Sequence, residues 1–242
     1  MHDSQPQPHV RFSAKTHVGR VRKVNEDSIL ALPDQQIWVV SDGMGGHEAG
    51  DFASRTVVDN IAMLPEGLTA VDKMRAVRQA LQDAHRIIVT EAEARNSVIG
   101  ATVVAFLLAD GHFGALWAGD SRLYRFRDGQ MDLLTNDHSL VGALVEAGQL
   151  TWDQAEHHPQ SNAITRAVGV GDDLELDKIR GEVSPGDRFL LCSDGLNKYA
   201  SIAEMGQALR GVPIEMVADK LVQMALDRGG ADNISVIVVD VI

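Results

Sequence analysis

Short runs of apolar residues, of the length typical of β-strands, recur along this chain. Asp-Gly pairs at Asp110 and Asp128 separate neighbouring runs and indicate hairpins. Because these connections are too short for a helical crossover, the strands that they join should be antiparallel. The pattern predicts strands at residues 29–32, 37–40, 101–109, 113–117, 123–126, 130–134, 188–192 and 234–242.

Three other segments have apolar residues at helical spacing, namely residues 48–64, 71–95 and 213–229. Pro213 suits the first turn of the last helix and Gly229 suits its end. Residues 139–165 have a mixed pattern, with short helical turns predicted near residues 140–145 and 151–156. Antiparallel strands with separate groups of helices indicate an α+β fold rather than an alternating βαβ domain.

Composition and charge limit the classes of protein to consider. The 242 residues are 45% hydrophobic and 23% charged, which suits a chain that buries the core of one domain. The net charge of −12 argues against nucleic acid or an anionic membrane as the main partner. One cysteine permits no internal disulfide, and no apolar run has the length of a membrane span. We expect a flexible tail at residues 1–8, a single domain at residues 9–242 and a cytoplasmic location.

Two nearly identical Ser-Asp-Gly phrases, at Asp42 and Asp194, each close an apolar run. Asp120 follows a third run, and Asp232 precedes the last one. Carboxylates at strand ends suit a hard divalent cation such as Mg²⁺ or Mn²⁺, which prefers oxygen ligands. For any one phrase the alternative is an ordinary turn, since Asp-Gly is a common turn signal.

A charged segment, residues 22–28, precedes the first run. Arg22 could bind a phosphate in a bidentate manner, and Glu26 and Asp27 could bind metal or water. For this segment alone, a solvated group of charges is the alternative. The glycines after Asp42 would let the backbone approach a ligand, and a carbonyl there could bind a metal. A phosphate-binding glycine loop is the weaker reading, because the spacing of the known nucleotide motifs is absent.

In their order and spacing, these motifs resemble those of the metal-dependent serine/threonine protein phosphatases of type 2C (PPM family). The resemblance runs from about residue 10 to the end and marks residues 9–242 as one catalytic domain. It implies a four-layer α-β-β-α sandwich with two central antiparallel sheets flanked by helix pairs. The bacterial branch is indicated by residues 134–139 and 162–169, which resemble its flap region. The matching motifs lie at residues 22–27, 41–46, 100–102, 119–122, 193–195 and 232–233.

The family implies a site for two Mn²⁺ or Mg²⁺ ions in a cleft at one end of the sandwich. By position, Asp42 would bridge both ions, the Gly43 carbonyl would bind one, and Asp194 and Asp232 would hold the other. Each Ser-Asp-Gly phrase would make the turn that delivers its aspartate to the ions. The resemblance also implies that Glu26 and Asp27 support metal-bound water or ligate a metal directly. Asp120 would bind a third, weaker ion, and Arg22 would bind the phosphate.

In this family a hydroxide activated by the two metals attacks phosphorus in line, and Arg22 would help to offset the charge on the phosphoryl oxygens. Some members carry a histidine after Asp-Gly as a candidate general acid, but this chain has Met44. His47 and His138 are candidates only through their proximity in the sequence, so the proton donor stays open.

The resemblance implies that the substrates are phosphoserine and phosphothreonine proteins, and that the partner is a cognate bacterial serine/threonine kinase or its substrates. We expect a monomer that binds neither nucleic acid nor membrane. Two alternatives stay open. One is an inactive family member that binds a phosphoprotein or a kinase, and the other is a hydrolase of small phosphate esters.

Overall fold

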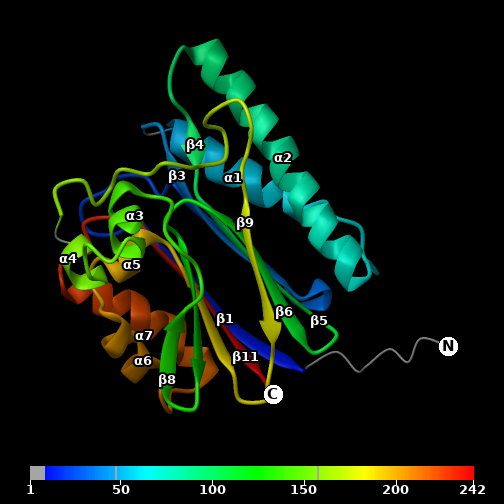
Figure 1. Cartoon of the computed structure of the whole chain (residues 1–242), viewed down its shortest axis with the longest axis vertical. Coiled ribbons are helices and arrows are strands. Elements are labelled where there is room, and N and C mark those ends of the chain that lie inside the picture. Colours follow the sequence, from blue (N-terminus) through cyan, green and yellow to red (C-terminus); the bar gives the residue numbers. More distant parts are fainter. Residues whose placement is uncertain (1–8, 47, 157) are drawn as a thin grey trace.

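Two antiparallel sheets face each other in the centre of the molecule, and helices cover the outer face of each (Figure 1). The computed structural model describes residues 9–46, 48–156 and 158–242. The tail expected at residues 1–8 lies outside the described residues. The α+β class and the α-β-β-α layers expected from the resemblance are confirmed. In the described part of the chain, no helix combines the length and apolarity needed to cross a membrane.

The strands form one sheet in the order β1-β11-β10-β7-β8 and a second in the order β2-β3-β5-β6-β9, with β4 paired to β3. Every pairing is antiparallel, including the two hairpins β5–β6 and β7–β8 that the Asp-Gly signals predicted. The strands are β1 (Val10–His17), β2 (Asp27–Leu32), β3 (Ile37–Met44), β4 (Gly100–Ala101), β5 (Val103–Ala109), β6 (His112–Ala118), β7 (Arg122–Arg127), β8 (Gln130–Leu133), β9 (Asp177–Glu182), β10 (Arg188–Cys192) and β11 (Ile234–Val241).

The helices match the predicted segments closely. The pair α1 (Glu48–Ala62) and α2 (Ala70–Arg95) packs on the second sheet. The pair α6 (Ile202–Leu209) and α7 (Ile214–Asp227) packs on the first sheet, and α6 was not predicted. The mixed segment contains two short helices, α3 (Leu140–Glu146) and α4 (Trp152–Glu156), as expected. Two further short elements are a 3₁₀ turn, Pro33–Gln35, and α5 (Asp194–Asn197).

Alternation along the central strands builds the core in layers. In β3, Ile37 and Val39 pack against α1 and α2, whereas Trp38 and Val40 point toward the other sheet. Because both faces of such a strand are buried, its sequence is a continuous apolar run. The edge strands β1 and β9 have half-exposed, mixed sequences, which explains why they were not predicted.

A cluster of aromatic side chains packs at the centre of the space between the sheets. The ring centroid of Phe189, on β10, lies 4.6 Å from that of Phe106, on β5, and 5.2 Å from that of Phe113, on β6. All three side chains are buried. This packing determines how the ends of the two sheets lie relative to each other.

We expect Phe189→Ala to lower the free energy of unfolding by about 3–5 kcal/mol, because it removes a buried ring and leaves a cavity between the sheets. Val98→Ala is the control, since Val98 is 72% exposed, and its effect should stay within about 0.5 kcal/mol. Urea unfolding of both variants measures the difference. A loss below about 1 kcal/mol for Phe189→Ala would contradict this account of the core.

Candidate metal centre

The site residues predicted from the sequence come together at one end of the two sheets. Asp27 on β2 lies opposite Asp42 on β3 in the strand register. Asp120 follows β6, Asp194 follows β10, and Asp232 precedes β11. The side chains of these strand ends are linked by hydrogen bonds and ion pairs between segments far apart in the sequence.

Asp42 lies inside a strand rather than in a turn, because β3 continues to Met44. Its backbone N–H donates to Thr102 Oγ1 at 3.0 Å, and its carbonyl accepts from the Thr102 N–H at 2.8 Å. The Thr102 hydroxyl thus accepts the hydrogen bond that a backbone carbonyl would otherwise accept. At this residue the strand predicted at 101–109 is interrupted and divides into β4 and β5. The expected turn at Asp42 is wrong, but the backbone of this aspartate is firmly held.

Asp194 is the first residue of α5, and Ser193 is the N-cap. The Ser193 hydroxyl donates to Asp27 Oδ2 at 2.8 Å and so joins the two sheets at the site. Lys198 follows one helical turn later, with Nζ 2.5 Å from Asp194 Oδ2 and 3.7 Å from Asp232 Oδ2. Lys198 was not predicted at this site, because a helix as short as α5 has no periodic signal in the sequence.

The glycine of each Ser-Asp-Gly phrase allows close backbone packing. A Cβ on Gly43 would lie 2.0 Å from the Gly50 carbonyl oxygen, and one on Gly195 would lie 1.9 Å from the Asn233 carbonyl oxygen. Neither glycine has the left-handed backbone of a tight turn. Both Ser-Asp-Gly phrases need the glycine, because neighbouring backbone leaves no space for a side chain at either strand end.

Asn233 connects the last strand to the loop that carries Arg22 and Glu26. Its Oδ1 accepts from the Glu26 N–H at 2.8 Å, and its Nδ2 donates to the carbonyls of Val18 and Val24 at 2.9 and 3.0 Å. The buried amide therefore positions this loop beside the aspartates. Only the neighbouring Asp232 was given a role from the sequence.

Arg22 forms a bidentate ion pair with Asp232, with Nε 3.0 Å from Oδ1 and Nη2 3.1 Å from Oδ2. Its side chain is half-exposed. The hydrogen bonds and charge of Asp232 raise the pKa of the guanidinium. The side chains of Arg22 and Lys198 thus lie against the carboxylates that the sequence assigned to a metal.

Burial shifts the acids of this cluster toward the neutral form. It raises the pKa of Asp27 to about 7 and that of Asp120 to about 8, and the neighbouring charge of Asp194 adds to both. Burial, followed by the charges of Asp27 and Asp194, also raises the pKa of Asp42 well above its ordinary value. Without a bound cation, the ionised forms of these carboxyl groups are therefore destabilised.

The donor atoms fit a hard divalent cation. Asp27, Asp120 and Asp194 each have a buried Oδ1 without a hydrogen-bond partner in the structure. Carboxylate and carbonyl oxygens are the ligands that Mg²⁺ and Mn²⁺ prefer. In the described ranges, no three His, Cys, Asp or Glu side chains already converge in a metal-binding geometry.

His138 is held by contacts beside the site. Its Nδ1 accepts from the Gly119 N–H at 3.2 Å, and its Nε2 lies 3.3 Å from Asp177 Oδ2. Its ring stacks on Trp117, and burial lowers its pKa. These contacts indicate a structural role for His138. His47, the other candidate proton donor, lies outside the described residues.

Arg122 attaches the following segment to β7. It forms a buried bidentate pair with Asp137, with Nη2 2.8 Å from Oδ2 and Nε 2.9 Å from Oδ1. Its guanidinium carbon also lies 4.2 Å from the ring centroid of Trp152, on α4. The segment that resembles a flap is thus joined to the sheet directly beside Asp120.

Comparison with known proteins agrees with this fold. Residues 16–227 match the family described as Protein phosphatase 2C. The chain is 35% identical to the serine/threonine protein phosphatase PstP of Mycobacterium tuberculosis over 96% of its own length and 45% of that protein. It is 36% identical to the serine/threonine phosphatase stp of Listeria innocua over 96% of its length and 95% of that protein. The chain therefore spans about half the length of PstP and nearly all of stp.

Solved structures give the same result. PppA, described as a key regulatory component of the T6SS in Pseudomonas aeruginosa, superposes with a TM-score of 0.91 at 41% identity, covering 98% of this chain and 99% of that one. The catalytic domain of PstP in complex with two manganese ions superposes with a TM-score of 0.83 at 34% identity, covering 96% and 98%. The fold places this chain in the class of two-sheet sandwich proteins with a cluster of acidic residues at one end. The chain belongs to the protein phosphatase 2C family.

The raised pKa of Asp27 makes stability depend on pH when metal is removed. Between about pH 4 and pH 7 the folded protein keeps a proton on Asp27 that the unfolded chain has lost, so the free energy of unfolding should fall as pH rises through this window. In chelator at about pH 8, Asp27→Asn should be more stable than the parent by about 1–3 kcal/mol. At about pH 4 the two should be equal.

Urea unfolding at the two pH values measures this difference. Asp128→Asn is the matched control, because Asp128 is exposed in a hairpin turn whose left-handed backbone also suits asparagine. Parallel pH profiles for Asp27→Asn and the parent would contradict the account of a strained acidic cluster.

Proposed function

We propose that this chain is a metal-dependent protein phosphatase that hydrolyses phosphoserine and phosphothreonine in proteins. The observation that carries the proposal is the meeting of Asp42, Asp194 and Asp232 with Arg22 at one end of the sandwich. The presence of all three aspartates argues against an inactive member of the family. Membership in the protein phosphatase 2C family and the manganese bound to PstP support the same activity.

We infer that two Mn²⁺ or Mg²⁺ ions bind at this site. Asp42 and the Gly43 carbonyl would hold one ion, Asp42, Asp194 and Asp232 the other, and Asp120 a weaker third ion. Glu26 and Asp27 would act through water or by direct ligation. The buried carboxylate oxygens without partners and the raised pKa values support these assignments. When bound, such ions supply Lewis-acid activation of water near neutral pH.

Arg22 would bind the phosphoryl group. Its planar guanidinium already makes two parallel contacts with Asp232, and the same fork matches two phosphate oxygens. Because it is half-exposed, it can turn toward a substrate. It would then offset the charge that develops on the phosphoryl oxygens during in-line attack.

The proton for the leaving alkoxide needs a separate source. Met44 has no proton to donate, and both ring nitrogens of His138 are engaged by Gly119 and Asp177. We infer that a water molecule in the site supplies this proton. The firmly held backbone of Asp42 would fix the position of the reacting groups.

We also propose that the chain acts as a cytoplasmic monomer that reverses the action of a serine/threonine kinase. Its net charge of −12 supports protein partners over nucleic acid or an anionic membrane. The names of PstP and stp, both serine/threonine phosphatases, support phosphorylated proteins as the substrate class.

Removal of metal and of the central aspartates tests the activity. We expect chelator to abolish hydrolysis of a phosphothreonine peptide, and added Mn²⁺ to restore it. Asp42→Asn and Asp194→Asn should each lower kcat/KM by about 100-fold or more, because each removes a charged oxygen ligand. Asp173→Asn, at an exposed position, is the control.

Two outcomes would count against this mechanism, namely turnover without metal and full activity in both variants. A chromogenic small phosphate ester, assayed in parallel, separates the two possible substrate classes. A higher kcat/KM for the ester than for the peptide would favour a hydrolase of small esters instead.

Arg22→Ala should raise KM for the phosphopeptide by about tenfold, because it removes a bidentate phosphate contact. The lost ion pair with Asp232 is partly exposed, so stability should change by no more than about 1 kcal/mol. Lys23→Ala is the matched control, since it removes the same charge at the next, exposed position. A parental KM in Arg22→Ala would refute the phosphate-binding role.

A further inference from the structure

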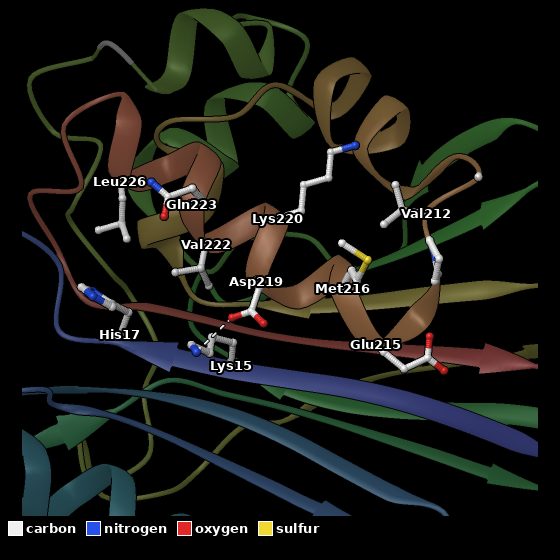
Figure 2. A pocket seen from close by; sticks show the side chains of 12 residues that line it. Lys15, His17, Val212, Glu215, Met216, Asp219, Lys220, Val222, Gln223 and Leu226 are labelled. Atoms are coloured by element: carbon white, nitrogen blue, oxygen red, sulfur yellow. Dashed lines mark ion pairs between the residues drawn. The ribbon is translucent and has the colours of Figure 1, made fainter.

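Among the open pockets away from the metal centre, two differ clearly in charge. The larger, of about 700 Å³, lies between β1 and α7. Its cations are Lys15 and Lys220, and its acids are Glu215 and Asp219. Lys15 forms an ion pair with Asp219 at 2.9 Å, as Figure 2 shows. This pocket is electrically balanced and indicates no particular class of ligand.

The second pocket, of about 500 Å³, lies between the beginning of α2 and the strands β5, β6 and β9. Arg75 and Arg78 line it from α2, and Lys178 and Arg180 line it from β9. We call this pocket the basic pocket. Figure 1 shows α2 along the second sheet, of which β9 is an edge strand.

The local sequence explains how the four cations come to face one pocket. Arg75 and Arg78 are three positions apart on a helix, so they share one face. Lys178 and Arg180 are two positions apart on a strand, so both point to the outer face of the sheet, while Ile179 packs between the two sheets.

The lower part of the basic pocket is apolar. Leu107 and Met74 line it on the helix side of the second sheet, and Leu107 is nearly fully buried. Gly114 leaves space for Met74, because a Cβ on that glycine would lie 2.3 Å from the Met74 Cε. The pocket thus combines an apolar floor with cationic walls.

The cations of the basic pocket are poorly compensated. Five cationic residues, including Lys73, line the pocket, against one acidic residue, Asp110. In the described part of the chain no ion pair is found for Arg78, Lys178 or Arg180. A local excess of positive charge in a chain of net charge −12 indicates a ligand that is itself anionic.

The other two cations that line the pocket, Arg75 and Lys73, do have partners in the structure. The nearest carboxylate to Arg75 is that of Asp72, at 3.7 Å. Lys73 is buried, and its Nζ donates to the carbonyls of Gln35 and Leu108 at 2.5 and 3.5 Å. Lys73 therefore adds positive charge beneath the pocket without being available for direct contact.

We propose that the basic pocket docks an acidic segment of the protein substrate, a proposal that rests on the function proposed above. Cations on two facing walls suit an extended peptide with carboxylates on both sides, and the apolar floor suits aliphatic residues between them. The overall negative charge disfavours a nucleic acid at the same place.

The position of the pocket fits a docking role separate from catalysis. It lies at the His112 end of β6, whereas Asp120 follows the other end of that strand. At about 3.3 Å per residue along the strand, His112 is roughly 25 Å from Asp120, and Lys178, which pairs with Leu116, is roughly 15 Å from it. A segment held there would raise the local concentration of a phosphorylated residue on the same substrate at the metal centre.

Direct binding tests the pocket without any need for catalysis. The probe is a short fluorescent peptide of alternating glutamate and valine residues that carries no phosphate, and binding to the full chain is followed by anisotropy. We expect the double variant Lys178→Gln/Arg180→Gln to bind about five- to tenfold more weakly than the parent. Added salt should weaken binding to the parent, because the contacts are exposed.

The matched control is Lys15→Gln/Lys220→Gln, which removes the same charge from the balanced pocket. It should bind the peptide within about twofold of the parent. Thermal melts should show both double variants folded, since Lys178 and Arg180 are exposed. Equal binding by the parent and both variants would overturn the proposal, and so would tighter binding of an oligonucleotide of the same net charge.

Activity assays then distinguish docking from catalysis. An acidic extension on a phosphothreonine peptide should lower KM for the parent and the control, but not for Lys178→Gln/Arg180→Gln, with kcat and small-ester turnover unchanged. An extension that lowers KM equally in all three proteins would refute the docking role alone. If the parent shows no metal-dependent turnover of either the peptide or the ester, the proposed function is refuted. The binding experiment would then still test whether the pocket docks an acidic segment.

Discussion

Carboxylate groups repel one another when they are brought together out of water, and this chain places Asp27, Asp42 and Asp120 in one such cluster. The cost appears as pKa values raised by burial and by neighbouring charge. Arg22 and Lys198 offset only part of it, through Asp232 and Asp194. A cluster of this kind persists because the surrounding fold holds it, as is common at functional sites.

The fold holds the cluster by joining segments far apart in the sequence. The Ser193 hydroxyl bonds Asp27, and the Asn233 amide bonds the loop before Glu26. Gly43 and Gly195 allow neighbouring backbone to approach more closely than any side chain would permit. These contacts place the ends of both sheets at one point, and the packed aromatic core between the sheets keeps that geometry from shifting.

The parts of this structure that have a periodic signal were predictable from the sequence. Continuous apolar runs indicated the buried strands, and the order of the acidic motifs indicated the site. The edge strand β9 was not predictable, because Lys178 and Arg180 interrupt its apolar pattern. The Asp-Gly at Asp42 was predicted as a turn, although its glycine serves close packing inside a strand. The contact of Lys198 with two aspartates depends on tertiary structure alone.

The same edge strand gives the molecule an uneven distribution of charge that its composition conceals. A chain of net charge −12 would repel most acidic proteins at long range, with a field that salt weakens. A local region of positive charge lies toward the end of the second sheet away from the carboxylates. It is formed by Lys178 and Arg180, which are exposed on β9, and by Arg78 on α2. An approaching acidic segment would therefore be attracted to one region and repelled elsewhere. For the proposed protein substrate, such a field would favour one orientation. This orientation would select among phosphorylated residues before any contact at the candidate metal centre.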